Sequence, residues 1–235
     1  MKNKNNFFFI TGIACLISSA ASAAFTSSGA LFSVTSSAGS GTLLNVPTQI
    51  TPAAWSNTGS WTGTNASVTW ANDIQGWNST TLAGFTNGNI VIRNNTTTAQ
   101  DFAVTIAMLG TATGPLVAAG SVGGQYVNGS ASLGSLTSTG ALWSAGIDGA
   151  TVNTQLNNAL FFAQPFQVVS LGSFSFSNLA ILNSLTNQAA IRFSLRLSAG
   201  GEASFTSTFS FQAVPGPASI ALIGFLPIVR SRRRR

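Results

Sequence analysis

Apolar and polar residues alternate strictly in two segments of the chain. Residues 102–108 carry Phe, Val, Ile and Met at every second position, and residues 191–197 carry Ile, Phe, Leu and Leu in the same way. A period of two places successive side chains on opposite faces of an extended strand, so both segments predict half-buried β-strands. Arg192 and Arg196 share the polar face of the second strand, where we expect them to keep an exposed surface soluble.

Another apolar run lies just before the first of these strands. Residues 89–93 read Asn-Ile-Val-Ile-Arg, and a polar link of seven residues, 94–100, separates them from the strand at 102–108. Two strands joined by a short polar link predict a hairpin, or two strands that are neighbours in one sheet.

The second strand leads into a further strand near the C-terminus. The turn at 198–202 contains Gly-Gly, and after it Phe205, Phe209 and Phe211 continue the two-residue period, with Ser207 in one inward position. We therefore predict a last Phe-rich strand whose inner face carries one hydroxyl group.

The remaining segments between residues 24 and 213 favour strands over helices. Shorter strand candidates lie at residues 31–35, 67–70, 121–127, 167–171 and 174–176. Helical periodicity is nearly absent, and only residues 152–160 and 178–188 have a pattern compatible with a short helix or a connecting turn. Many short strands separated by Gly, Ser and Asn predict an all-β domain at 24–213, a jelly-roll-like β-sandwich of short antiparallel strands.

The charges are concentrated at the two ends of the chain. The formal net charge of the 235 residues is +6, but residues 24–213 contain only three arginines and four acids, which leaves a net charge of −1. Residues 24–213, which we call the body, therefore contain no basic stretch that could bind nucleic acid, and no nucleic-acid partner is expected. We interpret the terminal charges as targeting signals.

The first 23 residues have the three parts of a secretory signal peptide. Lys2 and Lys4 form a positive beginning, residues 7–17 are apolar, and Ala21-Ser22-Ala23 matches an A-x-A cleavage site. Export through the Sec machinery and cleavage after Ala23 are expected. A transmembrane anchor is the alternative, disfavoured by the short apolar region.

Cys15 is the only cysteine and lies inside the predicted signal peptide. A lipid-attachment motif is a less favoured alternative, because Gly12 stands where such motifs carry a bulky aliphatic residue. Removal of the signal peptide leaves a mature chain with neither a disulfide nor a thiolate metal site.

The last 22 residues, 214–235, combine a proline motif, an apolar run and a basic end. From Val214 to Val229 the chain carries no charge over 16 residues. As a helix this length spans roughly 24 Å, which is marginal against a hydrocarbon core of about 30 Å. A basic cluster after an apolar run predicts a short transmembrane segment with a cytoplasmic C-terminus; the alternative is a core helix with a basic tail. The predicted membrane stop consists of Arg230, Arg232, Arg233, Arg234 and Arg235.

This tail resembles the PEP-CTERM sorting tail of exported bacterial proteins. The resemblance rests on Val214-Pro215-Gly216-Pro217, the apolar run and the terminal arginines, with Gly216 standing where the family usually has Glu. It implies recognition by an exosortase-like membrane protease that cuts near the motif. The protein would then be held transiently at the inner membrane and released to the cell surface or the medium.

The side chains of the body offer little for catalysis. The chain has no histidine, and its only lysines are Lys2 and Lys4, so triads with a histidine base and Schiff-base chemistry are excluded. A glycosidase needs two carboxyl groups about 5–10 Å apart. The body has four acids, and each has an ordinary turn or strand-edge explanation: Asp73, Asp101, Asp148 and Glu202. We expect no enzyme activity, no metal site and no cofactor.

Four tryptophans lie within 23 residues of one another, among Asn and Thr. Aromatic faces stack on sugar rings, so this stretch is a candidate glycan site, with core packing as the favoured alternative. Trp70 alternates with Val68 and is expected in the core. The candidates for glycan stacking are Trp55, Trp61 and Trp77.

Together these features predict an exported structural or adhesive protein of a bacterial cell surface or extracellular matrix. The expected partners are the Sec machinery, an exosortase-like protease, the membrane through the tail, and a surface polysaccharide. A carbohydrate-binding module that uses the tryptophan-rich stretch is the alternative, and a glycoside-active enzyme is a third, less favoured one.

Overall fold

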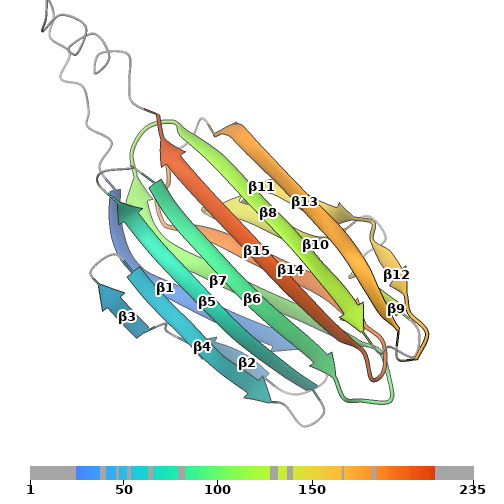
Figure 1. Cartoon of the computed structure of the whole chain (residues 1–235). Helices are drawn as coiled ribbons and strands as arrows, with labels where there is room; N and C mark the ends of the chain where they lie inside the picture. The colour runs from blue at the N-terminus through green and yellow to red at the C-terminus, as the bar shows by residue number, and fades with distance from the viewer. Residues whose placement is uncertain are drawn as a thin grey trace, which may run out of the picture. The chain divides into compact units, whose positions relative to one another are not determined.

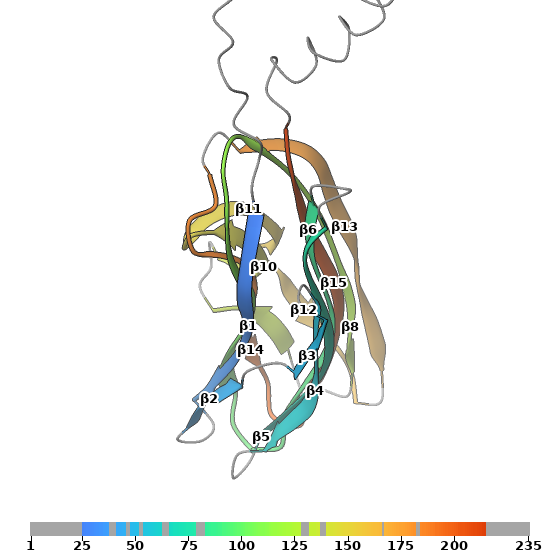
Figure 2. The same cartoon turned by 90° about the vertical axis from the view of Figure 1, so that its left-hand side faces the viewer.

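In the described part of the computed structural model, all helix-or-strand secondary structure is β-strand, and no helix is present. The description covers residues 25–37, 41–45, 48–51, 54–62, 66–78, 83–127, 132–136, 140–165, 167–181 and 184–214. The all-β prediction is confirmed for these residues. The strands form two antiparallel sheets whose faces lie against each other, as in a β-sandwich (Figures 1 and 2).

The first sheet has eight strands in the order β11-β10-β14-β7-β1-β2, with β9 and β12 attached beside β14. These strands are β1 (Phe25–Ser36), β2 (Gly41–Asn45), β7 (Gln100–Ala112), β9 (Ser132–Ser135), β10 (Ala141–Ile147), β11 (Ala150–Asn157), β12 (Leu160–Phe162) and β14 (Gln188–Leu197). We call it the eight-stranded sheet.

The second sheet has seven strands in the order β13-β8-β15-β6-β5-β4-β3. These strands are β3 (Thr48–Thr51), β4 (Ala54–Thr62), β5 (Ala66–Asn78), β6 (Ala83–Asn94), β8 (Leu116–Val127), β13 (Val168–Ile181) and β15 (Glu202–Ala213). We call it the seven-stranded sheet. In the edge-on view of Figure 2 the two sheets lie as two layers.

The two-residue alternation sets the inner face of each sheet. In β14 the four apolar residues at 191, 193, 195 and 197 are fully buried, whereas Arg192 and Arg196 are exposed, as predicted. Burial of one large apolar side chain stabilises a fold by about 1.5–3 kcal/mol. Ser207 of β15 also points inward and is fully buried, which confirms the prediction of a hydroxyl on the inner face.

Aromatic contacts join the two inner faces. Phe32 of β1 stacks on Trp70 of β5 with ring centroids 4.1 Å apart, and Phe193 of β14 lies 5.0 Å from Phe205 of β15. Trp70 is only 5% exposed, so its predicted place in the core is confirmed. Gly59 lies beside it on β4, where an added Cβ atom would approach the indole ring to 2.9 Å.

The predicted hairpin between residues 89–93 and 102–108 is wrong. The first run belongs to β6 of the seven-stranded sheet, and the second belongs to β7 of the eight-stranded sheet. The polar link is therefore a corner at which the chain passes from one sheet to the other. The turn between β14 and β15 is a second corner of the same kind.

A buried asparagine at the end of β6 joins these two corners. Asn94 is fully buried, and its Nδ2 lies 2.8 Å from the carbonyl oxygen of Thr98, 2.9 Å from that of Leu197 and 3.0 Å from that of Ser198. Its Oδ1 accepts a hydrogen bond from the backbone N–H of Thr96 at 3.0 Å. One buried side chain thus forms hydrogen bonds with backbone groups of both corners, which connects the polar link to the turn between β14 and β15.

The two stretches compatible with a helix do not form one. Residues 150–157 form β11, which pairs with β10, and the stretch 178–188 contains the end of β13, an isolated bridge at Leu185 and the start of β14. Pairing with neighbouring strands outweighs the weak local helical preference. The candidates at 167–171 and 174–176 are one strand, β13, with a register shift between Ser170 and Gly172.

Within the described residues no helix has the length and apolar character that crossing a membrane requires. The predicted signal peptide at 1–23 and the apolar run at 220–229 lie outside these residues.

Replacement of Asn94 by Ala tests the corner arrangement. The substitution removes three side-chain hydrogen bonds that a buried amide makes to carbonyl groups of the two corners, so we expect the free energy of unfolding to fall by roughly 3 kcal/mol. Urea unfolding followed by tryptophan fluorescence measures the change. Asn89→Ala, at an exposed position of the same strand, is the control and should change stability by less than about 1 kcal/mol. Equal effects of the two substitutions would contradict the assigned role of Asn94.

Candidate functional site

The described residues reach the beginning of the predicted sorting motif. Val214 is 41% exposed, and its backbone N–H donates to the carbonyl oxygen of Pro115 at 3.0 Å. The other predicted sorting and cleavage residues lie outside the described part: Ala21, Ala23, Pro215, Gly216, Pro217, Arg230, Arg232, Arg233, Arg234 and Arg235.

The tryptophan-rich stretch falls on the adjacent strands β4 and β5. Trp61 of β4 is half-buried and packs against the core, so its ring is only partly available to a ligand. Trp55 lies in β4 and Trp77 in β5, and their side chains are outside the description. An exposed aromatic platform is not assembled among the tryptophan side chains that the structure describes.

Two of the four acids form ion pairs with arginines on neighbouring strands. Asp101 of β7 accepts from Arg196 of β14 through both oxygens, with Nε–Oδ1 at 2.7 Å and Nη2–Oδ2 at 3.0 Å. Glu202 of β15 pairs with Arg93 of β6, whose Nε lies 2.8 Å from Oε2. Each pair links two strands of one sheet, in register.

Asp148 supports the turn between β10 and β11. Its own φ is 51° and that of Gly149 is 83°, the left-handed backbone that a tight hairpin requires. Its carboxylate accepts hydrogen bonds from the backbone N–H groups of Thr186, Asn187 and Gln188 at 2.7–2.9 Å, and from the Thr186 hydroxyl at 2.9 Å. Burial alone would raise the pKa of Asp148, but these hydrogen bonds outweigh it and lower the pKa below its ordinary value.

Three of the four acids therefore already hold structural partners. The side chain of the fourth, Asp73, is outside the description. Among the described residues there is no group of three or more His, Cys, Asp or Glu side chains that could hold a metal ion. The described carboxylates are placed to stabilise strands and a turn.

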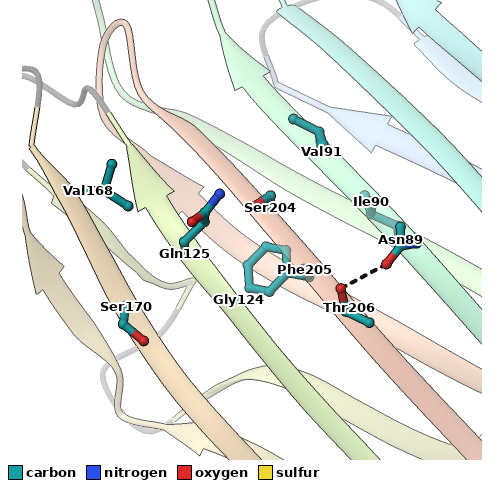
Figure 3. A pocket seen from close by; sticks show the side chains of 10 residues that line it. All are labelled: Asn89, Ile90, Val91, Gly124, Gln125, Val168, Ser170, Ser204, Phe205 and Thr206. Carbon is teal, nitrogen blue, oxygen red and sulfur yellow. Dashed lines mark hydrogen bonds between the residues drawn. The ribbon is translucent and has the colours of Figure 1, made fainter.

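A hollow of the described surface lies on the outer face of the seven-stranded sheet. It has a volume of about 510 Å³ and crosses β6, β15, β8 and β13 (Figure 3). Its lining consists of Asn89, Ile90, Val91, Gly124, Gln125, Val168, Ser170, Ser204, Phe205 and Thr206. We call it the polar groove.

Local backbone features of β8 and β13 shape the polar groove. Gly124 contributes no side chain, and an added Cβ atom there would lie 2.5 Å from the carbonyl oxygen of Ser204. The register shift after Ser170 and the positive φ of Gly172, 84°, interrupt the regular pairing of β13 with β8. A bulge bends its strand, so the edge of the sheet departs from the plane of its neighbours.

The polar groove presents uncharged hydrogen-bonding groups. Gln125 and Ser204 are register partners on adjacent strands, and neither side chain has a protein hydrogen-bond partner among the described residues (Figure 3). Thr206 donates to Asn89 Oδ1 at 2.8 Å, and Ser170 Oγ accepts from Gly172 N–H at 3.2 Å. Free amide and hydroxyl groups without a charge suit a neutral ligand rich in hydroxyl groups.

Sequence reasoning missed the polar groove, because its side chains come from four strands far apart in the chain. The Gly123-Gly124 pair inside a predicted strand was the one available signal, since glycine in a strand often marks a close approach or a gap.

Comparisons with known proteins assign no family to the chain. No family model, no curated protein and no solved structure matches it. The function is therefore argued from the residues and their arrangement.

Asp148 makes the stability of the fold depend on pH. A carboxyl group whose pKa is lowered by folding contributes stability above its unfolded pKa, about 3.9, and loses that contribution as the pH falls through the lowered pKa. We expect Asp148→Asn to destabilise the protein by about 1–3 kcal/mol at pH 7 and by much less at pH 2. Urea unfolding of both proteins at the two pH values measures this. A constant difference between them would contradict the assigned role of the carboxylate.

Proposed function

We propose that this chain is an exported, non-enzymatic protein of a bacterial cell surface or extracellular matrix. The observation that carries the proposal is that each acid with a described side chain is engaged in a structural contact, whereas the outer strand faces carry mainly uncharged polar residues. A catalytic pair of carboxylates would need at least one acid free to meet a substrate. Binding and scaffolding need only a stable body with a suitable surface.

The proposed route to the surface uses both ends of the chain. The signal peptide at 1–23 directs Sec export, and the apolar run with its arginines holds the chain transiently in the inner membrane. An exosortase-like protease then cuts near Val214–Pro217. The finer architecture is proposed to be jelly-roll-like, which is supported by the corners at which β6, β7 and β8 alternate between the two sheets.

A second proposed function is the binding of a neutral polysaccharide in the polar groove. It is supported by the unpartnered Gln125 and Ser204 side chains and by the size of the hollow, which falls within the usual range for small-molecule sites. The half-buried Trp61 lies away from this groove, on β4, so stacking by the tryptophan-rich stretch would be a separate mode of binding.

Mass spectrometry of the protein isolated from its native host tests the proposed processing. We expect an N-terminus at Ala24 and a C-terminus close to Val214–Pro217, because these are the sites that the two signals predict. A variant with Pro215 and Pro217 replaced by Ala should retain its C-terminal arginines. Mature material that begins at Met1 or ends at Arg235 would contradict the proposed route.

A glycan array tests the second function. We expect the wild type to bind a neutral glycan, and the Gln125→Ala/Ser204→Ala double variant to bind it at least about tenfold more weakly, because two hydrogen-bonding groups are lost. Thr58→Ala, at an exposed position of β4 outside the groove, is the matched control. Trp61→Ala separates groove binding from aromatic stacking. Absence of binding by the wild type, or an equal loss in Thr58→Ala, would contradict groove binding.

A further inference from the structure

A second, smaller hollow lies on the outer face of the eight-stranded sheet. Its volume is about 100 Å³, which corresponds to roughly three water molecules. It is lined by β7, β10, β14, β11 and the turn between β10 and β11, through Thr105, Ser144, Ala145, Gly146, Gly149, Thr151, Gln188, Ala190 and Arg192. We call it the arginine pocket.

The charge of Arg192 distinguishes this pocket from the rest of the described surface. Arg93 is paired with Glu202, and Arg196 is paired with Asp101. Arg192 has neither an ion pair nor a hydrogen bond to any other residue that the structure describes. It is the one arginine among the described residues whose charge is not compensated, although it shares a strand face with Arg196.

Small and hydroxyl-bearing residues surround Arg192. Its register partners are Thr105 on β7 and Ser144 on β10, each about 5 Å away across the sheet. Ala190 lies two positions from Arg192 along β14, about 6.6 Å away, and pairs with Gly146 of β10. Because both residues are small, no large side chain fills the centre of the pocket. Arg192 thus lines a hollow together with hydroxyl-bearing residues of both neighbouring strands.

We propose that the arginine pocket binds the carboxylate or sulfate group of an acidic polysaccharide. A guanidinium donates two parallel hydrogen bonds to such an oxyanion, and the Thr105 and Ser144 hydroxyls add further donors. A volume of about three water molecules accommodates the anionic group, while the sugar ring remains above the sheet. The choice of an extracellular polysaccharide as the source of the anion rests on the proposed export.

The nearest acid does not compensate Arg192. Asp148 precedes Gly149 at the far end of the pocket, where its carboxylate is held by the donors of residues 186–188. Arg192 lies four positions from Gln188 along an extended strand, about 13 Å away. The anion is therefore expected beside Arg192 and not at the Gln188 end.

The experiment measures polysaccharide binding by the full chain in mild detergent, with its terminal charges removed. Those charges would bind any polyanion, so glutamine replaces Lys2, Lys4, Arg230, Arg232, Arg233, Arg234 and Arg235 in every protein compared. The probes are polygalacturonate, dextran sulfate and neutral dextran, followed by affinity electrophoresis. We expect binding to one or both acidic polymers, weakening as NaCl is raised, and no binding to dextran.

Three single substitutions decide whether Arg192 is responsible. Arg192→Gln should weaken binding at least about tenfold, and Arg192→Lys should weaken it less, because the charge stays but the planar fork is lost. Arg196→Gln removes the same unit of charge from the same strand face and should leave the affinity within about twofold. Thermal unfolding checks that all variants are folded.

The proposal is overturned if the parent protein binds neither acidic polymer, or if Arg196→Gln weakens binding as much as Arg192→Gln does. Its failure is distinct from failure of the proposed function. If the native protein keeps its signal peptide, it is not exported, and an extracellular polysaccharide is excluded as its ligand. Arg192-dependent binding of acidic polymers in vitro could still be observed in that case.

Discussion

The arrangement of the two sheets depends on a buried polar contact. The chain passes between sheets after β6 and after β14, and the fully buried side chain of Asn94 lies between these two corners. Asn94 satisfies groups from both corners, and the hydroxyl of Tyr126 lies 2.8 Å from that of Ser198 beside them. Burial raises the pKa of Tyr126, partly offset by this hydrogen bond, so the phenol stays neutral. Because an unpaired buried group costs about 1–3 kcal/mol, these side chains fix the corners and, with them, the positions of β6, β14 and β15.

Among the described strands, the packing leaves the outer faces of the two sheets for binding. Large apolar side chains fill the inner faces, and the acids with described side chains hold arginines or a turn, so function has to be sought among the exposed polar residues. The two outer faces differ in chemistry. The seven-stranded sheet offers uncharged amide and hydroxyl groups in the polar groove, and its arginine Arg93 is neutralised by Glu202. The eight-stranded sheet carries the uncompensated charge of Arg192.

Local patterns predicted the strands but not their partners. The two-residue alternation in β7, β14 and β15 predicted which residues are buried, including Ser207 of β15, because the period of two depends on the backbone alone. A polar link such as 94–100 is equally compatible with a hairpin and with a corner, and the choice is made by contacts of Asn94 with residues about 100 positions away. Arg192 and Arg196 look alike in sequence, and only the register with Asp101 separates them. The polar groove could not be predicted from local patterns, because its residues come together only when β6, β15, β8 and β13 are placed side by side.

The two proposed binding surfaces face in opposite directions, because each lies on the side of its sheet that is turned away from the shared core. A ligand held by the polar groove therefore leaves the arginine pocket free, and one copy of the protein has room for two polymers at once. Each contact by itself is weak, since exposed hydrogen bonds and a single charge-assisted pair compete with water. Polysaccharides repeat the same group along their length, so many copies bound to one polymer raise the total affinity through effective concentration. A nearly uncharged body suits this role, because it adds little long-range repulsion or attraction to the contacts that the two surfaces make.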